Sequence, residues 1–221
     1  MSGPAAPVVL LQGSPHAGGV SDCLADAFAA QFPAHTVQRV ALREHHIAPC
    51  RGCNACVAPP HRCVLAGAND DTDGIFAAMQ QALLLVIAAP IYFYGLPGQS
   101  KGFIDRGQRL WQARTACMTD TGGHDAGMAP HNGPHEGPGR RRNRPAIALL
   151  AAGRPRGEQL FAGALLTLKY FFNLFDATLA EQRCLYGLDD VAALRARPAV
   201  LADIRALGQH WAHLLMWETS R

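Results

Sequence analysis

The chain contains the apolar run Leu-Leu-Leu-Val-Ile-Ala-Ala at residues 83–89, and this stretch decides its fold. The run has no polar side chain on either face, which is typical of a central strand in a parallel sheet that helices cover on both sides. Runs of the same character occur at residues 7–11 and at residues 145–153, where the second ends in glycine. The three runs predict three buried parallel strands.

Amphipathic helices are expected between these strands. Val20, Leu24, Phe28 and Phe32 recur at every fourth position, with Ser21 near the expected N-cap. Further helices are expected from residue 73, over 100–111 with Ser100 as cap, over 160–175 and from Pro198, and further strands at 36–42 and 177–185. Since strands and helices alternate throughout, we expect a single α/β domain over residues 1–221 with a parallel sheet and right-handed crossovers.

Composition and charge exclude several classes of protein. Apolar residues make up 49% of the 221 residues and charged residues 17%, which is typical of a globular chain. A net charge of +3 gives no argument for a nucleic-acid partner. No run reaches the roughly 20 apolar residues of a membrane span. The N-terminus lacks the pattern of a secretory signal, so we expect a cytoplasmic protein without membrane contact.

Three loops should meet at one edge of the sheet, because ligands of parallel α/β sheets bind outside the carboxyl ends of the strands. These loops are Gly13–Ser21, Pro90–Gly98 and Gly153–Gly157. The first is glycine-rich, leads into a helix N-terminus and carries the hydroxyls of Ser14 and Ser21, which suits a phosphate group. It is not a Walker A loop and does not fit GxGxxG. An ordinary strand–helix turn with Ser21 as cap is the alternative.

The second loop carries the consecutive aromatic residues Tyr92, Phe93 and Tyr94. Exposing three aromatic side chains is unfavourable, so we expect them to be buried against another group. A flat isoalloxazine ring with hydrogen-bonding edges suits such a loop. A neighbouring helix or a second subunit would cover it equally well.

Four of the seven cysteines, Cys50, Cys53, Cys56 and Cys63, follow the pattern C-x2-C-x2-C-x6-C. An odd number of cysteines without an export signal argues against a disulfide framework, and clustered thiolates in a reducing compartment bind metal or do redox chemistry. The compact spacing favours a cubane iron–sulfur cluster over zinc, for which two separated pairs are usual. A loop of free cysteines is the alternative. Cys23, Cys117 and Cys184 are expected to be core or incidental residues.

Several motifs occur together in a fixed order. Gly-Ser-Pro-His-Ala-Gly-Gly-Val-Ser at residues 13–21 is followed by Pro-Cys-Arg-Gly-Cys-Asn-Ala-Cys at 49–56 with Cys63, by Pro-Ile-Tyr at 90–92 and by Lys-Gly-Phe-Ile-Asp-Arg at 101–106. This ordered set resembles the NAD(P)H-dependent FMN reductase and iron–sulfur flavoprotein family. The resemblance extends from Val8 to the C-terminal helix, apart from residues 118–145.

The resemblance implies a flavodoxin-like, doubly wound five-stranded parallel sheet in the order 2-1-3-4-5, with FMN at its carboxyl edge. The first loop would bind the FMN phosphate, and the second and third loops would surround the ring. It also implies a [4Fe-4S] cluster, near the flavin, on the four clustered cysteines. The implied cofactor-binding residues are Ser14, His16, Gly18, Gly19, Val20, Ser21, Pro90, Ile91, Tyr92, Phe93, Tyr94, Gly95, Gly153 and Arg154.

The chain departs from this family's pattern at two positions. His16 stands where the family usually has arginine, and Val20 where it usually has asparagine. Phosphate binding would then depend on Ser14, Ser21 and backbone N–H groups.

The family also implies an activity. Electrons would pass from NAD(P)H or a ferredoxin-like donor through FMN, and through the cluster, to a small-molecule or protein acceptor. The flavin carries the reactive chemistry, so we nominate no catalytic acid or base. A cluster-free FMN or quinone reductase and a non-enzymatic electron carrier are the alternatives. A homodimer or homotetramer is expected.

Two segments interrupt the alternation of strands and helices. Residues 44–73 form a cysteine-rich excursion, and residues 118–145 form a glycine-rich insertion that we expect to be mobile. The insertion contains His124, His131 and His135, and four arginines at positions 140–142 and 144. We expect these histidines and arginines to face water, the alternatives being a metal site and a contact to the 2′-phosphate of NADPH.

Overall fold

The computed structural model describes residues 7–119 and 144–219. These residues build a five-stranded sheet in the order β2-β1-β3-β4-β5, with every neighbouring pair parallel. The α/β class and the predicted strand order are confirmed. The strands are β1 (Val8–Gln12), β2 (Val37–Ala41), β3 (Leu84–Pro90), β4 (Arg144–Ala152) and β5 (Ala177–Tyr186).

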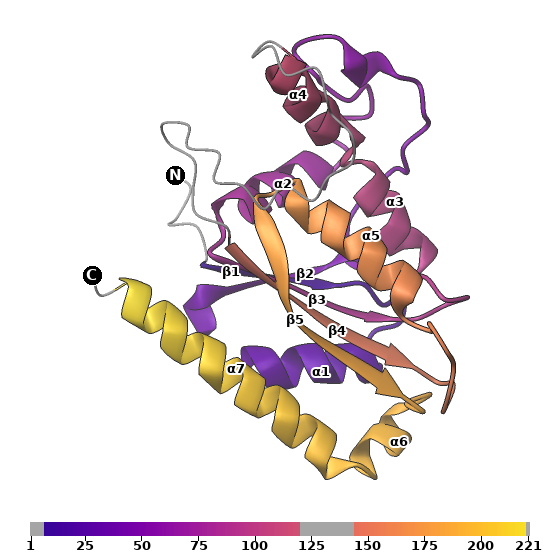
Figure 1. Cartoon of the computed structure of the whole chain (residues 1–221), viewed down its shortest axis with the longest axis vertical. Helices are drawn as coiled ribbons and strands as arrows, with labels where there is room; N and C mark the ends of the chain where they lie inside the picture. The colour runs from indigo at the N-terminus through magenta and orange to yellow at the C-terminus, as the bar shows by residue number, and fades with distance from the viewer. Residues whose placement is uncertain (1–6, 120–143, 220–221) are drawn as a thin grey trace.

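Helices cover both faces of the sheet (Figure 1). One face carries α1 (Val20–Ala29), α6 (Val191–Arg195) and α7 (Pro198–Thr219), and the other carries α2 (Thr72–Gln81), α3 (Gly98–Asp105) and α5 (Ala162–Asn173). Successive residues of β3 alternate between the two apolar cores, Leu84 and Val86 on the α1 side and Leu85 and Ile87 on the α5 side. This double burial is the reason why the run at residues 83–89 is apolar throughout.

The helix expected over residues 100–111 is two helices. α3 ends at Asp105, and α4 (Gln108–Thr119) begins after Arg106 and Gly107. A Cβ atom on Gly107 would lie 2.7 Å from Leu174 Cδ1, so the chain turns where it passes close to the end of α5. Ser100 is not the cap: Pro97 takes that position, and the Ser100 hydroxyl donates to Gly13 O at 2.9 Å.

Other helix boundaries also differ from prediction. Gly19, not Ser21, takes the N-cap position of α1, which ends at Ala29 instead of residue 32. α5 begins at Ala162 instead of residue 160, and the short helix α6 was not predicted. Helix ends are set by backbone capping and local packing, which hydrophobic periodicity does not report.

The excursion between β2 and α2 is closed at its base. The His46 N–H donates to Asp71 Oδ2 at 2.9 Å, and the Asp71 N–H donates to His46 O at 3.0 Å. Between them the chain is irregular apart from the 3-10 helix η3 (Ala55–Val57), which contacts α4. In Figure 1 the excursion and α4 project beyond the layer of α2, α3 and α5.

The predicted insertion lies mostly outside the described residues, and so do its three histidines and Arg140–Arg142. The expectation that these side chains face water is wrong for Arg144, the last arginine of the insertion. Arg144 is buried and donates to Met79 O and Gln80 O at 3.0 Å, and to the carbonyls of Ala82 and Phe175. It thus satisfies carbonyls at the end of α2. Within the described ranges, no helix has the length and apolarity that a membrane crossing needs.

Candidate functional site

The loops after β1, β3 and β4 meet at one edge of the sheet, as predicted. The three strands pair in register, so that Gln12 lies opposite Ala88 and Ala88 opposite Leu149. At this edge the Gly13 N–H donates to Ala88 O and the Ile91 N–H donates to Ala151 O, both at 2.8 Å. These bonds connect the starts of the loops after β1 and β3 to the neighbouring strand. The sheet therefore fixes where these two loops begin.

The loop at residues 13–19 forms a tight turn around Ser14. The buried Ser14 hydroxyl donates to His16 O at 3.0 Å, and the His16 N–H returns a bond to Ser14 Oγ at 3.2 Å. A Cβ atom on Gly13 would lie 2.6 Å from Ser100 Oγ, so this position requires glycine. Gly18 has a φ of +68°, a conformation that glycine adopts without strain. The His16 side chain is exposed.

The N-terminus of α1 opens directly from this loop. The first bond of the helix runs from the Cys23 N–H to Gly19 O at 3.1 Å, so the N–H groups of Val20, Ser21 and Asp22 have no carbonyl partner within the helix. Gly19 at the N-cap position has no side chain to accept from them, and Ser21 is buried as the second helical residue. An uncapped helix N-terminus with free N–H groups and a positive dipole end suits an anion.

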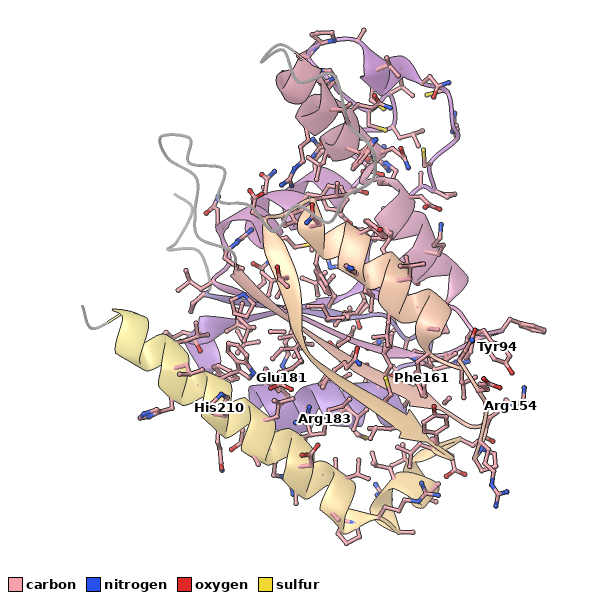
Figure 2. All side chains as sticks on the ribbon, in the orientation of Figure 1. Tyr94, Arg154, Phe161, Glu181, Arg183 and His210 are labelled. Carbon is pink, nitrogen blue, oxygen red and sulfur yellow. The ribbon has the colours of Figure 1, made fainter. Side chains whose placement is uncertain are left out.

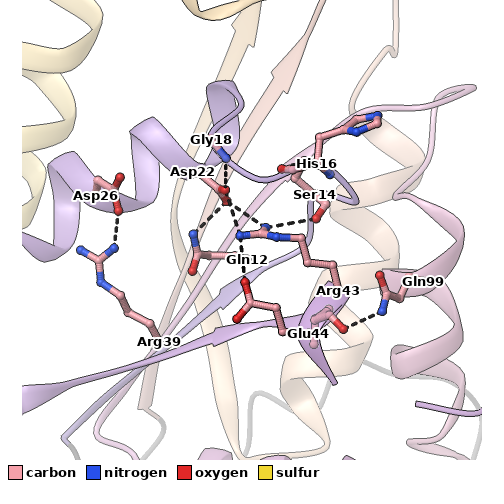
Figure 3. Close-up of polar contacts among 11 residues, drawn as sticks. Gln12, Ser14, His16, Gly18, Asp22, Asp26, Arg39, Arg43, Glu44 and Gln99 are labelled. Carbon is pink, nitrogen blue, oxygen red and sulfur yellow. Dashed lines mark hydrogen bonds and ion pairs between the residues drawn. The ribbon is translucent and has the colours of Figure 1, made fainter. Parts of the chain in front are cut away.

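A buried polar network, which the sequence did not predict, forms hydrogen bonds to the backbone of the loop at residues 13–19 (Figure 3). Asp22 accepts from the Gly18 N–H at 2.8 Å and from Gln12 Nε2 at 2.8 Å. It also pairs with Arg43, whose Nη2 lies 3.0 Å from Asp22 Oδ2 and whose Nη1 lies 3.3 Å from Ser14 O. Asp22 lies off the apolar stripe of α1, so periodicity alone places it in solvent. Its position in the first turn beside a glycine loop is the signal that could have found it.

The aromatic loop is a tight hairpin, not a buried cluster. Tyr92 and Gly95 exchange two backbone bonds of 2.9 Å, and between them Phe93 and Tyr94 have φ angles of 48° and 64°. The Phe93 side chain is fully exposed, and those of Tyr92 and Tyr94 are about half exposed. In the described residues no neighbouring helix buries the three aromatics, and their burial against a flavin ring or a second subunit stays a prediction. Two adjacent non-glycine residues in the left-handed region also store backbone strain, which is concentrated at functional sites in proteins.

Arg154 connects the aromatic hairpin to the loop after β4. Its Nη1 donates to the Tyr94 hydroxyl at 3.0 Å, and its guanidinium carbon lies 5.8 Å from the centre of the Tyr94 ring. Figure 2 shows the two side chains pointing toward each other at the edge of the molecule. Gly153 precedes Arg154, and a Cβ atom there would lie 2.3 Å from Oδ1 of the exposed Asp189 side chain. Tyr94 and Arg154, two of the predicted ring-binding residues, are thus in contact.

The four clustered cysteines line one cavity of about 300 Å³, together with Asp105, Gln108 and Gln112 of α3 and α4. Burial raises the pKa of the Cys56 thiol, and its neighbours Cys63, Cys50 and Cys53 raise that pKa further. Within residues 7–119 and 144–219, no three histidine, cysteine or acidic side chains converge as the ligands of one metal ion would. The thiols are therefore distributed around a shared space.

A buried ion pair holds the cysteine excursion to Arg106, directly after the end of α3. Arg106 Nη1 and Nη2 donate to the two carboxylate oxygens of Asp70 at 2.6 and 3.0 Å, and Nη1 also donates to Ala48 O at 2.9 Å. Burial acts to raise the pKa of Asp70, but the bonds from Arg106 outweigh it, so that this pKa lies below its usual value. Burial likewise acts to lower the pKa of Arg106, while Asp70 and Cys63 raise it overall.

The cysteine excursion and the aromatic hairpin are separate parts of this chain. In Figures 1 and 2 the excursion lies beside α4, away from the edge where Tyr94 and Arg154 are labelled. The expectation that the cysteines lie near the flavin loops is therefore not met within one chain.

The sequence profile described as NADPH-dependent FMN reductase matches residues 6–132. The chain belongs to this family. An iron-sulfur flavoprotein of Methanosarcina thermophila is 32% identical to it over 83 residues, which are 38% of this chain and 41% of that protein. An FMN-dependent NADH:quinone oxidoreductase of Cereibacter sphaeroides is 29% identical over 133 residues, 59% of this chain and 60% of that protein. The matches thus span about half the length of these curated relatives.

Solved structures share the fold of this member of the FMN reductase family. An FMN-dependent NADH-azoreductase from Bacillus anthracis, in complex with FMN, superposes with a TM-score of 0.58 at 13% identity, covering 93% of this chain and 99% of that one. A flavone reductase superposes with a TM-score of 0.61 at 16% identity, covering 93% of this chain and 62% of that one. At such identities the likeness concerns the fold alone.

Proposed function

We propose that this chain is an FMN-dependent oxidoreductase that takes electrons from NAD(P)H or a ferredoxin-like donor and delivers them to an acceptor through a [4Fe-4S] cluster. One observation carries the flavin part: the uncapped N-terminus of α1 opens at the same sheet edge as the aromatic hairpin and Arg154. The family to which the chain belongs supports it.

The phosphate of FMN would bind at the loop after β1. Three N–H groups in the first turn of α1 are free to donate, and Ser14 holds the turn that faces them. Gly18 and Gly19 keep side chains out of the space above that turn. The residues proposed for this part of the site are Ser14, His16, Gly18, Gly19, Val20 and Ser21.

The flavin ring would lie against Pro90–Gly95, with Gly153 and Arg154 at its edge. Exposed aromatic side chains at the hairpin offer an apolar surface, while Arg154 and the Tyr94 hydroxyl offer polar groups beside it. Bound FMN supplies hydride and single-electron transfer. The chain's own residues would orient the ring and cover it from water, and no side chain is proposed as a general acid or base.

The cluster would be held by Cys50, Cys53, Cys56 and Cys63. A [4Fe-4S] cluster takes one thiolate on each of four iron atoms, so its ligands surround a volume instead of converging on a point. Four thiols around one cavity of about 300 Å³ suit that requirement. The name of the Methanosarcina thermophila relative, an iron-sulfur flavoprotein, supports the same interpretation.

A cluster-free NAD(P)H:quinone reductase is the second candidate. The Cereibacter relative, named for quinone reduction, aligns with 59% of this chain, against 38% for the Methanosarcina relative. In this case the cysteines would be free thiols of a surface loop.

A homo-oligomer forms part of the proposal. Leu165, Leu166 and Leu179 line an open apolar groove between α5 and β5, and Phe93 is exposed elsewhere on the surface. A second copy of the chain is the occupant that we expect. Light scattering of the purified protein at several concentrations tests this, and a monomer throughout would contradict it.

Anaerobic purification followed by flavin, iron and sulfide analysis tests the function. About one FMN with about four irons and four sulfides per chain, together with NAD(P)H oxidation, supports the full proposal. FMN and turnover of a quinone without iron, even after reconstitution, supports the second candidate. Bound FMN without any NAD(P)H turnover would indicate a non-enzymatic electron carrier. Failure to bind added FMN would contradict the cluster-containing enzyme, the cluster-free reductase and the electron carrier alike.

A further inference from the structure

The loop proposed to bind the FMN phosphate lies next to a negative charge in the first turn of α1. The loop at residues 13–19 contains no lysine or arginine, and Asp22 places a carboxylate behind it. That carboxylate accepts the Gly18 N–H at 2.8 Å, and the Asp22 side chain is only 7% exposed. A phosphate dianion at the N-terminus of α1 would therefore bind within a short distance of a poorly screened negative charge.

Arg43 compensates the negative charge of Asp22. From η2 (Leu42–Glu44) its guanidinium pairs with both Asp22 oxygens, at 3.2 Å from Nη1 to Oδ1 and at 3.0 Å from Nη2 to Oδ2. The same Nη1 lies 3.3 Å from Ser14 O, so the guanidinium also contacts the loop itself. Glu44 faces Nη2 at 3.5 Å, but its side chain is largely in water, where its charge is screened.

We propose that Arg43 is the charge-compensating residue of the flavin-phosphate site, and that it determines the preference for FMN over unphosphorylated riboflavin. The inference rests on the proposed function of the loop. Arg43 is a positioning residue here, since it acts through Asp22 and Ser14. The positive charge of Arg43 explains how a loop in which His16 is the only basic side chain can bind a phosphate.

A neutral substitution of Arg43 separates charge from shape. In Arg43→Gln the Asp22 carboxylate loses its counter-charge while Gln12 and Gly18 still bind it. The dissociation constant for FMN should rise about tenfold or more, and that for riboflavin should change by less than about twofold. Arg43→Lys keeps the charge without the bidentate geometry and should recover most of the FMN affinity.

The chain offers a matched control on the same helix. Arg39 of β2 pairs with Asp26 of α1 through a single contact, and both of these side chains are exposed (Figure 3). Arg39→Gln removes the same unit of charge. It should leave the dissociation constants for FMN and riboflavin within about twofold of the wild type, because exposed pairs contribute little.

A double variant keeps the test valid if Arg43→Gln folds poorly. In Arg43→Gln with Asp22→Asn, the asparagine oxygen can accept the Gly18 N–H while its amide donates to a reoriented Gln12. No unpaired buried charge then remains. This variant should bind FMN several-fold more tightly than Arg43→Gln alone.

Titration of the apoproteins with FMN and with riboflavin, followed by flavin fluorescence, measures the ratio of the two constants. A selective loss for FMN in Arg43→Gln, absent in Arg39→Gln and reversed in the double variant, supports the inference. Equal losses for both flavins would mean that the pair only holds the loop in shape, and unchanged FMN affinity would mean that it has no role; either result overturns the inference. If wild-type protein binds neither flavin, the proposed function itself fails.

Discussion

The loop at residues 13–19 and the excursion at residues 46–71 both follow a strand of the sheet, but they depend on the sheet to different degrees. The loop begins with a bond from Gly13 to β3 and ends as the first turn of α1, so ordered structure fixes both of its ends within a few residues. The excursion is tied at its base through Asp70, Asp71 and Arg106, and beyond that it contacts α4. The fold alone builds the first site, whereas the second is a tethered loop around a cavity.

This difference predicts how each region responds to the loss of its ligand. A site whose geometry comes from the sheet is preorganised and should keep its shape without a cofactor. A loop that ligands cross-link should depend on them, because metal–thiolate bonds then replace the missing secondary structure. The following experiments test that contrast, beginning with the largest expected effects.

Replacing Ser14 and Ser21 together by leucine should abolish FMN binding, since two buried hydroxyls would become bulky side chains at the phosphate loop. Flavin content after purification measures the loss. The double alanine variant is the control for folding: it should keep the wild-type circular dichroism and bind FMN more weakly. Iron content should be unchanged in both variants. A folded leucine variant with normal FMN content would contradict the assignment of the loop.

Cys53→Ser should remove iron and sulfide from anaerobically prepared protein and leave FMN in place. Loss of the cluster should also make residues 50–63 more sensitive to limited proteolysis, because the loop has little secondary structure of its own. Cys184→Ser on β5 is the matched control and should change neither property. Iron retained in full after Cys53→Ser would rule this cysteine out as a ligand.

Arg106→Met should lower the free energy of unfolding by about 3–5 kcal/mol, because it leaves Asp70 as an uncompensated buried charge. The side chains of this pair are only 1% and 5% exposed. Urea denaturation measures the change. Lys101→Met, which breaks the exposed pair with Asp105 on the same helix, should lower it by less than about 1 kcal/mol. Similar losses in the two variants would show that the buried pair does not anchor the excursion.

The sequence was sufficient for the sheet because its central strand is apolar on both faces. It was not sufficient for the break between α3 and α4. That break depends on Arg106 turning inward to Asp70, which is 36 positions away in the chain, and on Gly107 passing close to Leu174. Helical periodicity is a local pattern and contains no information about such contacts.

In the candidate site, too, features set by local sequence were predicted, and features set by contacts between distant residues were not. Parallel topology was enough to predict that three loops meet at one edge, and the spacing of four cysteines was enough to predict that they share a space. The Asp22–Arg43 pair was missed because its members come from different elements, 21 positions apart. The hairpin's conformation was not predictable from the aromatic run, because the two-residue turn with positive φ angles at Phe93 and Tyr94 is not a property of hydrophobicity.

The smallest expected effect concerns that hairpin, and it should have opposite signs for stability and function. Phe93 is fully exposed at a φ of 48°, so its side chain contributes strain and no packing to this chain. Asparagine tolerates the left-handed region better, and Phe93→Asn should therefore raise the free energy of unfolding by about 0.5–1 kcal/mol. If the exposed ring covers the flavin, as we propose, the same variant should turn over NAD(P)H more slowly. Urea denaturation of the apoprotein and steady-state kinetics of the FMN-bound enzyme measure the two effects. A variant that is less stable than the wild type would show that Phe93 is packed, in solution, against a second copy of the chain, whereas greater stability with unchanged turnover would remove Phe93 from the proposed flavin site.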